Sequence, residues 1–247
     1  MQILLQVQNL NKNFGEMKIL KDINLEVAAG EFLTIMGQSG SGKSTLLYCI
    51  SGMDRATSGT ISYDNLDLAG LPDAEMSEVR LKHMGFIFQH SYLLKNLSIR
   101  DNIVLPGFKA EMVPREAVVE NAEEYMKMTG IDHIASHTIN EVSGGQLQRA
   151  AICRALINQP SVLFGDEPTG ALNSSTTEEV MDILNAINNQ GTSIILVSHD
   201  AKVANRSARI IYLSDGKIKD ELILGAYTGP DAAREEKLTD WLNEMRF

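Results

Sequence analysis

The sequence predicts an α/β protein with a mostly parallel sheet, an antiparallel β subdomain and a helical subdomain, and three patterns support this prediction. Residues 161–213 alternate short apolar runs with helical periodicity, an order that indicates βαβ units and a parallel sheet. Residues 2–63 contain segments in which apolar and polar residues alternate, as they do in half-buried antiparallel strands. Residues 66–156 carry apolar residues at three- and four-residue spacing, which is typical of helices.

The N-terminal zone is predicted to be rich in β-strands. Residues 4–8 and 23–27 have the alternation expected of strands with one face in the core. Residues 31–36 are almost continuously apolar, so we expect a strand that is buried on both faces.

Helices dominate the predicted middle zone, with the clearest periodicity at 116–129 and 146–157. We expect Pro106 and Pro114 to interrupt this pattern, because proline lacks an amide donor and clashes with the preceding helical turn. Residues 90–157 are therefore predicted to form a helical subdomain inserted in the core.

The C-terminal zone returns to alternating elements. The predicted strands are 162–164, 193–198 and 210–213, and a helix is predicted at 176–187. Gly225 and the pair Gly229-Pro230 end this pattern. We therefore expect a main domain over residues 1–224 and a separate amphipathic helical extension over residues 225–247.

The extension is predicted to hold one helix that begins near Asp231, with Pro230 suited to the first turn. Its apolar residues recur at helical spacing and include the only tryptophan of the chain. These residues are Leu238, Trp241, Leu242 and Met245. Such a face either docks on its own domain or meets a partner or second copy, and the sequence leaves both open.

Composition excludes several classes of protein. The 247 residues are 44% hydrophobic and 22% charged, which fits a globular chain with a real core. The net charge of −10 disfavours a surface that tracks nucleic-acid phosphates, so we expect no nucleic-acid partner. Cys49 and Cys153 lie in apolar surroundings without a CxxC spacing, which indicates reduced, buried thiols.

The apolar runs are far shorter than the roughly 18 residues that a membrane-spanning helix needs. The N-terminal sequence MQILLQVQNL lacks the basic region and the cleavage site of a signal peptide. We therefore expect neither a spanning helix nor a secretory signal, and we expect a cytoplasmic chain.

Residues 37–45 match the P-loop pattern GxxxxGK[ST] and directly follow a predicted strand. The glycines allow backbone amides to turn toward a polyphosphate, and the helix that follows points its positive end at the same group. Lys43 would place a cation on the outer phosphates, and the Ser44 hydroxyl is suited to ligate Mg²⁺. The predicted phosphate-binding residues are Gly37, Ser39, Gly40, Ser41, Gly42, Lys43, Ser44 and Thr45.

Polar residues also follow the other predicted strands. Because ligands bind beyond the carboxyl ends of parallel strands, these side chains are expected to meet the P-loop in one crevice. Asp166 is predicted to bind the Mg²⁺ hydration shell, and Glu167 to orient or deprotonate the water that attacks the γ-phosphate. Gln89 has an amide suited to hold a metal ligand or a water, although an ordinary loop residue is the alternative. His199 alone is weak evidence for a catalytic role, because a histidine at a strand end more often satisfies local hydrogen bonds than performs chemistry.

The segment Val142-Ser143-Gly144-Gly145-Gln146 precedes a predicted helix. Ser143 and Gln146 have the spacing of a capping box. Gly144 and Gly145 have no side chains, so an anion could approach the backbone amides at the start of the helix. This segment resembles the LSGGQ signature of ATP-binding cassette (ABC) ATPases, with Val142 as a conservative departure. The remaining family elements occur in the same order, so the resemblance covers nearly the whole chain.

The resemblance implies a P-loop NTPase (RecA-like) core that binds ATP and Mg²⁺. It also implies an ATP-dependent head-to-tail dimer, in which the P-loop of one copy and residues 143–146 of the other enclose each nucleotide. Phe14 resembles the aromatic residue that stacks on adenine, although an aromatic beside an early strand is also commonly core. Gln89 resembles the residue that senses Mg²⁺ and the membrane partner, and His199 the histidine that contacts the γ-phosphate.

The chain departs from the family pattern at Asn173, where an aspartate is usual. An amide can still form a hydrogen bond across a dimer but cannot carry that negative charge, so coupling between the two nucleotide sites is in question. Glu167 is retained, which argues against an inactive cassette. Residues 86–106 and the C-terminal tail resemble the macrolide-efflux and lipoprotein-release branch, which bacterial peptide-antibiotic resistance pumps also use.

We therefore expect the ATP-hydrolysing subunit of a transporter, peripheral on the inner face of the cell membrane. It would power an integral membrane permease that exports, or confers resistance to, an antimicrobial peptide, a macrolide or a lipid-like substrate. The first alternative is an ATPase that regulates a cell-envelope or division complex through a membrane partner without transport. The others are a soluble cassette of translation or DNA repair, which the single P-loop disfavours, and a nucleotide-binding module without turnover.

Overall fold

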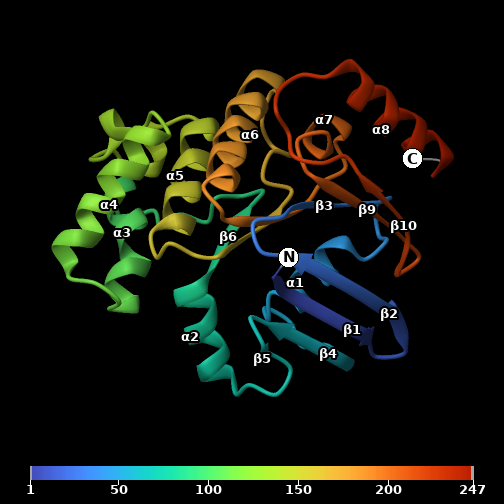
Figure 1. The fold of residues 1–247 in the computed structure, drawn as a ribbon. Coiled ribbons are helices and arrows are strands. Elements are labelled where there is room, and N and C mark those ends of the chain that lie inside the picture. The colour runs from blue at the N-terminus through green and yellow to red at the C-terminus, as the bar shows by residue number, and fades with distance from the viewer. Residues whose placement is uncertain (1, 246–247) are drawn as a thin grey trace.

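The computed structural model describes residues 2–245, and Figure 1 shows how its helices and strands are arranged. Met1, Arg246 and Phe247 lie outside the described residues, and so do the outer ends of the predicted ranges 1–224 and 225–247. The elements are, in chain order, β1 (Ile3–Phe14), β2 (Met17–Ala28), β3 (Phe32–Met36), α1 (Lys43–Ile50), β4 (Ser58–Tyr63), β5 (Leu66–Asp67), α2 (Asp73–His83), β6 (Met84–Phe88), α3 (Ile99–Ala110), α4 (Arg115–Met128), η1 (Asp132–Ile134), η2 (Ile139–Glu141), α5 (Gly144–Leu156), β7 (Val162–Asp166), α6 (Ser174–Asn189), β8 (Ser193–Val197), α7 (Ala201–Ala204), β9 (Arg209–Ser214), β10 (Lys217–Ile223) and α8 (Ala232–Glu244).

The larger sheet has the strand order β10-β9-β3-β8-β7-β6, and every neighbouring pair is parallel except β9 and β10. The predicted α/β class with a mostly parallel sheet is confirmed. Its strands end level with one another, because Phe88 pairs with Asp166, Asp166 with Val197, and Val197 with Ile35. The carboxyl ends of β6, β7, β8 and β3 therefore meet at one edge, where parallel sheets bind ligands.

The smaller sheet is antiparallel, with the order β2-β1-β4-β5, and lies below the larger sheet in Figure 1. Its first two strands are longer than predicted. Residues 4–8 and 23–27 fall within strands of 12 residues each, because the ladder between β1 and β2 continues through several register shifts.

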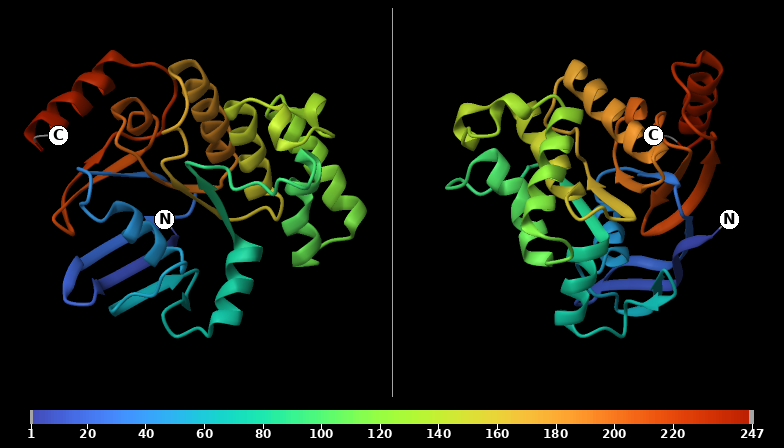
Figure 2. Two further views of the ribbon diagram at one scale, coloured as in Figure 1. Left: turned by 180° about the vertical axis from the view of Figure 1, so that it is seen from behind. Right: turned by 60° about the vertical axis from the view of Figure 1, so that its left-hand side comes forward.

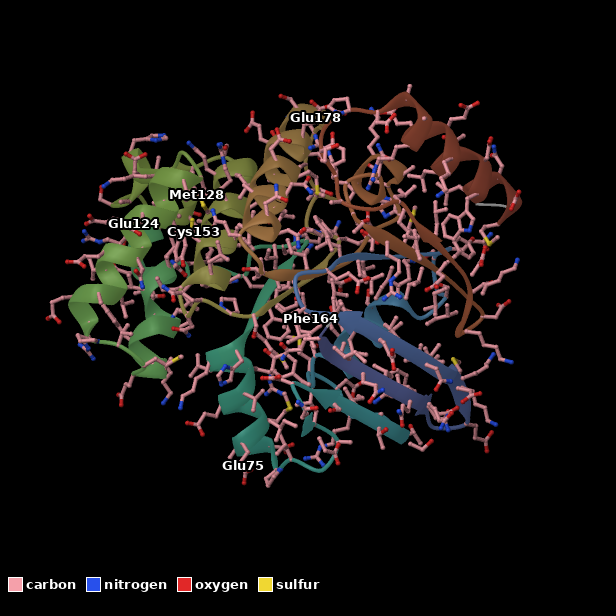
Figure 3. The ribbon with its side chains drawn as sticks, viewed as in Figure 1. Glu75, Glu124, Met128, Cys153, Phe164 and Glu178 are labelled. Carbon is pink, nitrogen blue, oxygen red and sulfur yellow. The ribbon has the colours of Figure 1, made fainter. Side chains whose placement is uncertain are left out.

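Two layers of apolar side chains cover the faces of the larger sheet. Alternate residues of β7 point to opposite faces, so that Phe164 joins the core with α1 and the smaller sheet, and Leu163 joins the core beneath α5 and α6. Figure 3 labels Phe164 in the region between the two sheets. Figure 2 shows the two sheets and the helices around them from behind and after a turn of 60°. Because both faces of the larger sheet are covered by apolar side chains, polar functional groups are expected at its carboxyl edge.

Helices α3, α4 and α5 share a hydrophobic cluster of their own, which includes Ile103, Val118 and Cys153. Figure 3 shows Cys153 within this group of helices. The expectation that Pro106 interrupts the helical pattern is wrong, because Pro106 lies inside α3. The Pro106 carbonyl accepts a hydrogen bond from Asn158 Nδ2 at 3.3 Å, so tertiary contacts support the helix at this position. Pro114, in contrast, directly precedes α4.

Helix α8 packs against the edge of the larger sheet that holds β9 and β10 (Figure 1). Leu238, Trp241 and Leu242 are buried there together with Tyr212, and the Trp241 indole donates to Asp220 Oδ2 at 2.7 Å. The apolar face of this helix thus docks on its own chain. The expectation that Pro230 occupies the first turn is wrong, because Asp231 caps the helix and its first residue is Ala232.

The buried Arg234 fixes the start of α8 to the body of the chain. Its guanidinium donates hydrogen bonds to the backbone carbonyls of Asn205, Ser207, Leu224 and Gly225. Within residues 2–245, no helix is long and apolar enough to cross a membrane.

Candidate nucleotide site

The loop between β3 and α1 is the centre of the candidate site. Gly40 has a φ of 78° with open space around it, so its backbone conformation, rather than crowding, favours glycine. A Cβ on Gly37 would overlap the Leu213 carbonyl, so this glycine allows the loop to pass close to β9. The loop ends at Gly42, which caps α1, and the helix directs its positive end into the loop.

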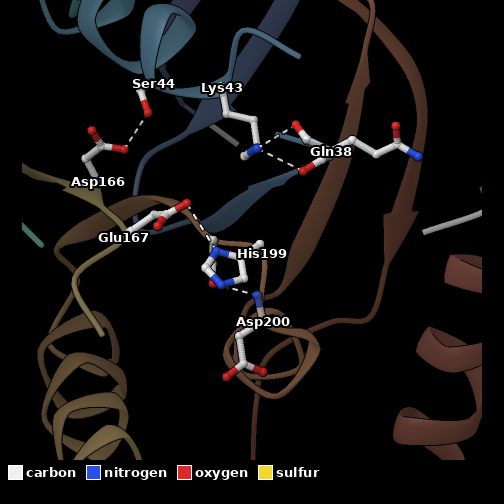
Figure 4. A network of polar contacts seen from close by, with 9 residues as sticks. Gln38, Lys43, Ser44, Asp166, Glu167, His199 and Asp200 are labelled. Carbon is white, nitrogen blue, oxygen red and sulfur yellow. Dashed lines mark hydrogen bonds and ion pairs between the residues drawn. The ribbon is translucent and has the colours of Figure 1, made fainter. Parts of the chain in front are cut away.

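Lys43 is only 8% exposed and folds back over the loop. Its Nζ donates to the carbonyls of Gly37 at 2.8 Å and Gln38 at 2.9 Å, as Figure 4 shows. Burial lowers the pKa of Lys43, and the negative charges of Glu167 and Asp166 oppose that shift. The ammonium group is therefore held inside the loop, in position to meet an incoming anion.

Asp166 at the end of β7 faces α1. Its Oδ1 accepts from the Ser44 hydroxyl at 2.8 Å (Figure 4), and its Oδ2 accepts from the Tyr48 hydroxyl at 2.5 Å. Burial and the bond to Asp166 raise the pKa of Tyr48, so its phenol stays a donor. Tyr48 was not predicted as a site residue from the sequence, although its four-residue spacing from Ser44 places both side chains on one face of a helix.

The donor set of Ser44 and Asp166 fits Mg²⁺. Both residues offer oxygen atoms. The Ser44 hydroxyl donates its hydrogen to Asp166, which leaves the lone pairs of the Ser44 oxygen available for a cation. Among residues 2–245, no group of three or more His, Cys, Asp and Glu side chains is arranged to hold a metal ion. Such a group is not needed at a nucleotide site, because Mg²⁺ usually binds one or two protein groups, waters and substrate phosphates.

Glu167 and His199 face each other at the same edge of the sheet. Glu167 Oε1 and His199 Nδ1 lie 3.2 Å apart, and the His199 side chain is 63% exposed (Figure 4). Glu167 has a φ of 48°, a left-handed conformation that is uncommon for residues with a side chain. Its amide is held by the Val197 carbonyl at 3.0 Å, so the turn after β7 is anchored to β8.

One open cavity of about 740 Å³ joins most of these groups. It is lined by Phe14, Ile19, Gly37, Gln38, Ser39, Gly40, Gly42, Lys43, Ser44, Thr45, Glu167 and His199. Phe14 is 54% exposed, and Lys12 Nζ lies 4.6 Å from the centre of its ring. Phe14 is therefore an accessible aromatic surface at the cavity and not a core residue.

Two of the predicted site residues, Ser41 and Gln89, do not line this cavity. Ser41 is buried, its hydroxyl has no hydrogen-bond partner among the described residues, and it does not line the cavity. Gln89 follows β6 and does not line the cavity either. Its side-chain amide lies next to Gly170, because a Cβ placed on Gly170 would be 3.1 Å from Gln89 Nε2.

Residues 143–146 do not line the cavity of their own chain. Ser143 and Gln146 form the predicted capping box at the start of α5. Gly145 has a packing reason to be glycine, because a Cβ there would lie 2.5 Å from Thr176 Cγ2. A Cβ on Gly144 would meet no atom within 4 Å, so no contact among the described residues explains why this position lacks a side chain.

Asn173 is the N-cap of α6, where its side chain accepts from the Thr176 amide at 2.9 Å. This local role needs an oxygen acceptor, which aspartate and asparagine both supply. This capping role of Asn173 was not predicted from the sequence.

Comparisons with known proteins agree with this geometry. A family model described as "ABC transporter" matches residues 20–170. The chain is 41% identical to the lipoprotein-releasing system ATP-binding protein LolD of Leptospira interrogans, over 87% of this chain and 90% of that protein. It is 38% identical to the bacitracin export ATP-binding protein BceA of Halalkalibacterium halodurans, over 90% of this chain and 89% of that protein.

Among solved structures, the chain is similar to the dimeric post-hydrolysis state of the ATP-binding cassette MJ0796 bound to ADP and Pi. The TM-score is 0.83 and the identity 38%, over 91% of this chain and all of that one. The P-loop cavity, the strand-end carboxylates and these relatives together lead to one conclusion. The chain belongs to the ABC transporter family, as an ATP-binding cassette of its lipoprotein-release and macrolide-efflux branch.

Proposed function

We propose that this chain is the ATP-hydrolysing subunit of an ABC transporter and powers a separate integral membrane permease. The main support for this proposal is the cavity at the carboxyl edge of the sheet. There the phosphate loop, the exposed ring of Phe14, Glu167 and His199 line a single space. An adenine ring, a triphosphate and an attacking water each find a matching group in it.

The phosphate chain lies on the backbone amides of residues 37–45, with Lys43 supplying positive charge to the outer phosphates. Ser44, Asp166 and Gln89 are the residues that would hold Mg²⁺. When bound there, the ion would supply positive charge that neutralises the charge on the phosphate oxygens. The adenine ring stacks on Phe14, whose ring is exposed at the cavity.

Glu167 acts as the general base for hydrolysis. Its carboxylate lies at the cavity within 3.2 Å of His199, so the two side chains frame one position for a water molecule and the γ-phosphate. Glu167 orients that water and accepts its proton, and His199 contacts the γ-phosphate.

Residues Ser143, Gly144, Gly145 and Gln146 contact the nucleotide of a second copy in a head-to-tail dimer. The open space around Gly144 supports this role, since a backbone without a side chain lets a phosphate approach the start of α5. The similar cassette MJ0796 is dimeric in its structure with ADP and Pi, which supports a dimer. ATP then stabilises the dimer as a shared ligand, and hydrolysis releases it.

The transported substrate is an antimicrobial peptide, a macrolide or a lipid-like molecule, and the direction is export or release from the membrane. Support comes from relatives named for lipoprotein release and for bacitracin export. The subunit works in the cytoplasm, bound peripherally to the inner face of the cell membrane through its permease.

The variant Glu167→Gln tests the proposal. It should keep ATP binding, lose at least about 100-fold in hydrolysis rate because the base is gone, and accumulate an ATP-bound dimer. Phosphate release and sedimentation velocity with and without ATP measure these outcomes. Glu178→Gln, at an exposed position of α6 outside the nucleotide cavity, is the matched control and should behave as the wild type. Unchanged hydrolysis in Glu167→Gln would remove Glu167 as the base.

A further inference from the structure

Helix α1 contacts Asp166 at both carboxylate oxygens, and only one of the two contacts belongs to the phosphate loop. Ser44 and Tyr48 are four residues apart, so their side chains lie on one face of the helix. The Ser44 hydroxyl donates to Oδ1 at 2.8 Å, and the Tyr48 hydroxyl donates to Oδ2 at 2.5 Å. One helical face therefore holds a carboxylate that comes from a strand 118 positions away in the sequence.

Packing explains the ring of Tyr48 but not its hydroxyl group. The ring lies against the core between the two sheets and is partly buried there. Phenylalanine would fill the same space. The hydroxyl group adds a short bond to a carboxylate, and bonds of this kind, from a neutral donor to an ionised acceptor, are stronger than those between neutral groups.

The bond has a consequence for the second oxygen. With Oδ2 held by Tyr48, the carboxylate cannot rotate about its last side-chain bond without losing a hydrogen bond, so Oδ1 stays directed toward Ser44. Groups that hold a metal-binding carboxylate in one orientation raise the affinity of the site, because less order has to be created when the ion binds.

We propose that Tyr48 is a positioning residue for the Mg²⁺ that accompanies ATP: its hydroxyl fixes Oδ2 of Asp166 and so presents Oδ1, next to Ser44, to the cation. This inference rests on the proposed function, in which Ser44 and Asp166 hold Mg²⁺. Tyr48 does not line the nucleotide cavity, so we expect the loss of its hydroxyl to change the metal dependence of nucleotide binding rather than binding without metal.

The variant Tyr48→Phe tests the inference, because it removes one hydroxyl group and keeps the ring. Binding of a fluorescent, non-hydrolysable ATP analogue is titrated first in EDTA and then over a range of MgCl₂ concentrations. Tyr63→Phe is the matched control, since it removes a partly buried phenol hydroxyl that bonds to Ser161 at 2.6 Å, remote from the phosphate loop. Thermal unfolding curves accompany each titration, and Tyr48→Leu provides a second variant without the hydroxyl.

In EDTA, Tyr48→Phe should bind the analogue within twofold of the wild type. The MgCl₂ concentration for half-maximal enhancement should rise about 10-fold in Tyr48→Phe and Tyr48→Leu, and stay unchanged in Tyr63→Phe. An unchanged Mg²⁺ midpoint in the Tyr48 variants, with a wild type that responds to Mg²⁺, would overturn the role of Tyr48 alone. A wild type that binds no analogue at all would overturn the proposed function itself.

Discussion

Replacing Gly145 by alanine would place a Cβ 2.5 Å from Thr176 Cγ2, where carbon atoms normally pack about 3.5–4.0 Å apart. This overlap of about 1 Å lies between α5 and α6. The side chain of Thr176 is short and restricted at χ1, so it cannot move out of the way as a long flexible side chain would. The substitution is therefore expected to push these two helices apart locally.

The expected cost follows from two opposing effects. Overpacking of this kind costs about 1–3 kcal/mol, and the better helix propensity of alanine returns up to about 1 kcal/mol. With the middle of the overpacking range, about 2 kcal/mol, the net loss is about 1–2 kcal/mol, which corresponds to a fall in Tm of roughly 2–8 °C for a chain of this size. Gly144→Ala meets no neighbour within 4 Å, so it should leave Tm unchanged or slightly raised.

The assay pairs thermal unfolding, followed by circular dichroism, with ATP hydrolysis. Gly145→Ala should lower Tm, and adding Thr176→Ser should restore most of it, because serine lacks the overlapping methyl group. Gly144→Ala should keep Tm but lose hydrolysis, since its methyl group enters the space where a second copy presents its phosphate. A Tm that Thr176→Ser fails to restore, or a full rate in Gly144→Ala, would refute this reasoning.

Three further predictions concern stability and reactivity. Arg234→Met should lower the free energy of unfolding by about 3 kcal/mol in urea titrations, because its guanidinium donates to four backbone carbonyls; an unchanged midpoint would contradict this. Burial raises the pKa of Cys49 and Cys153 to about 12, so at pH 8 both stay neutral thiols. A disulfide reagent should then label them only after unfolding, and rapid labelling of the native protein would count against it. Asn173→Asp should keep the cap of α6 and raise Tm by about 1–3 °C in calorimetry, because a negative charge is favourable at a helix N-terminus; a lower Tm would be the opposite result.

The sequence was sufficient to predict the sheet and the groups at its carboxyl edge. The strands β3, β7 and β8 are short, apolar and followed by polar residues, so local patterns reveal both the strand and the position of Lys43, Asp166 and His199. Parallel pairing then brings them to one edge without any further information.

What the sequence could not provide depends on contacts between distant segments. The pairing of Tyr48 with Asp166 spans 118 positions and requires the known packing of α1 on β7. Pro106 was expected to end a helix by its local chemistry, yet the helix continues through it. Arg234 bonds to backbone carbonyls, which every residue has, so no side-chain pattern indicates its partners.

The central claim is that residues 37–45 bind a triphosphate whose outer phosphate is also contacted by residues 143–146 of a second copy. The most direct measurement is a crystal structure of Glu167→Gln grown with ATP and Mg²⁺. We expect two copies head to tail, with each ATP between the P-loop of one copy and Gly144 of the other. A nucleotide bound away from the P-loop, or enclosed by one copy alone, would contradict it.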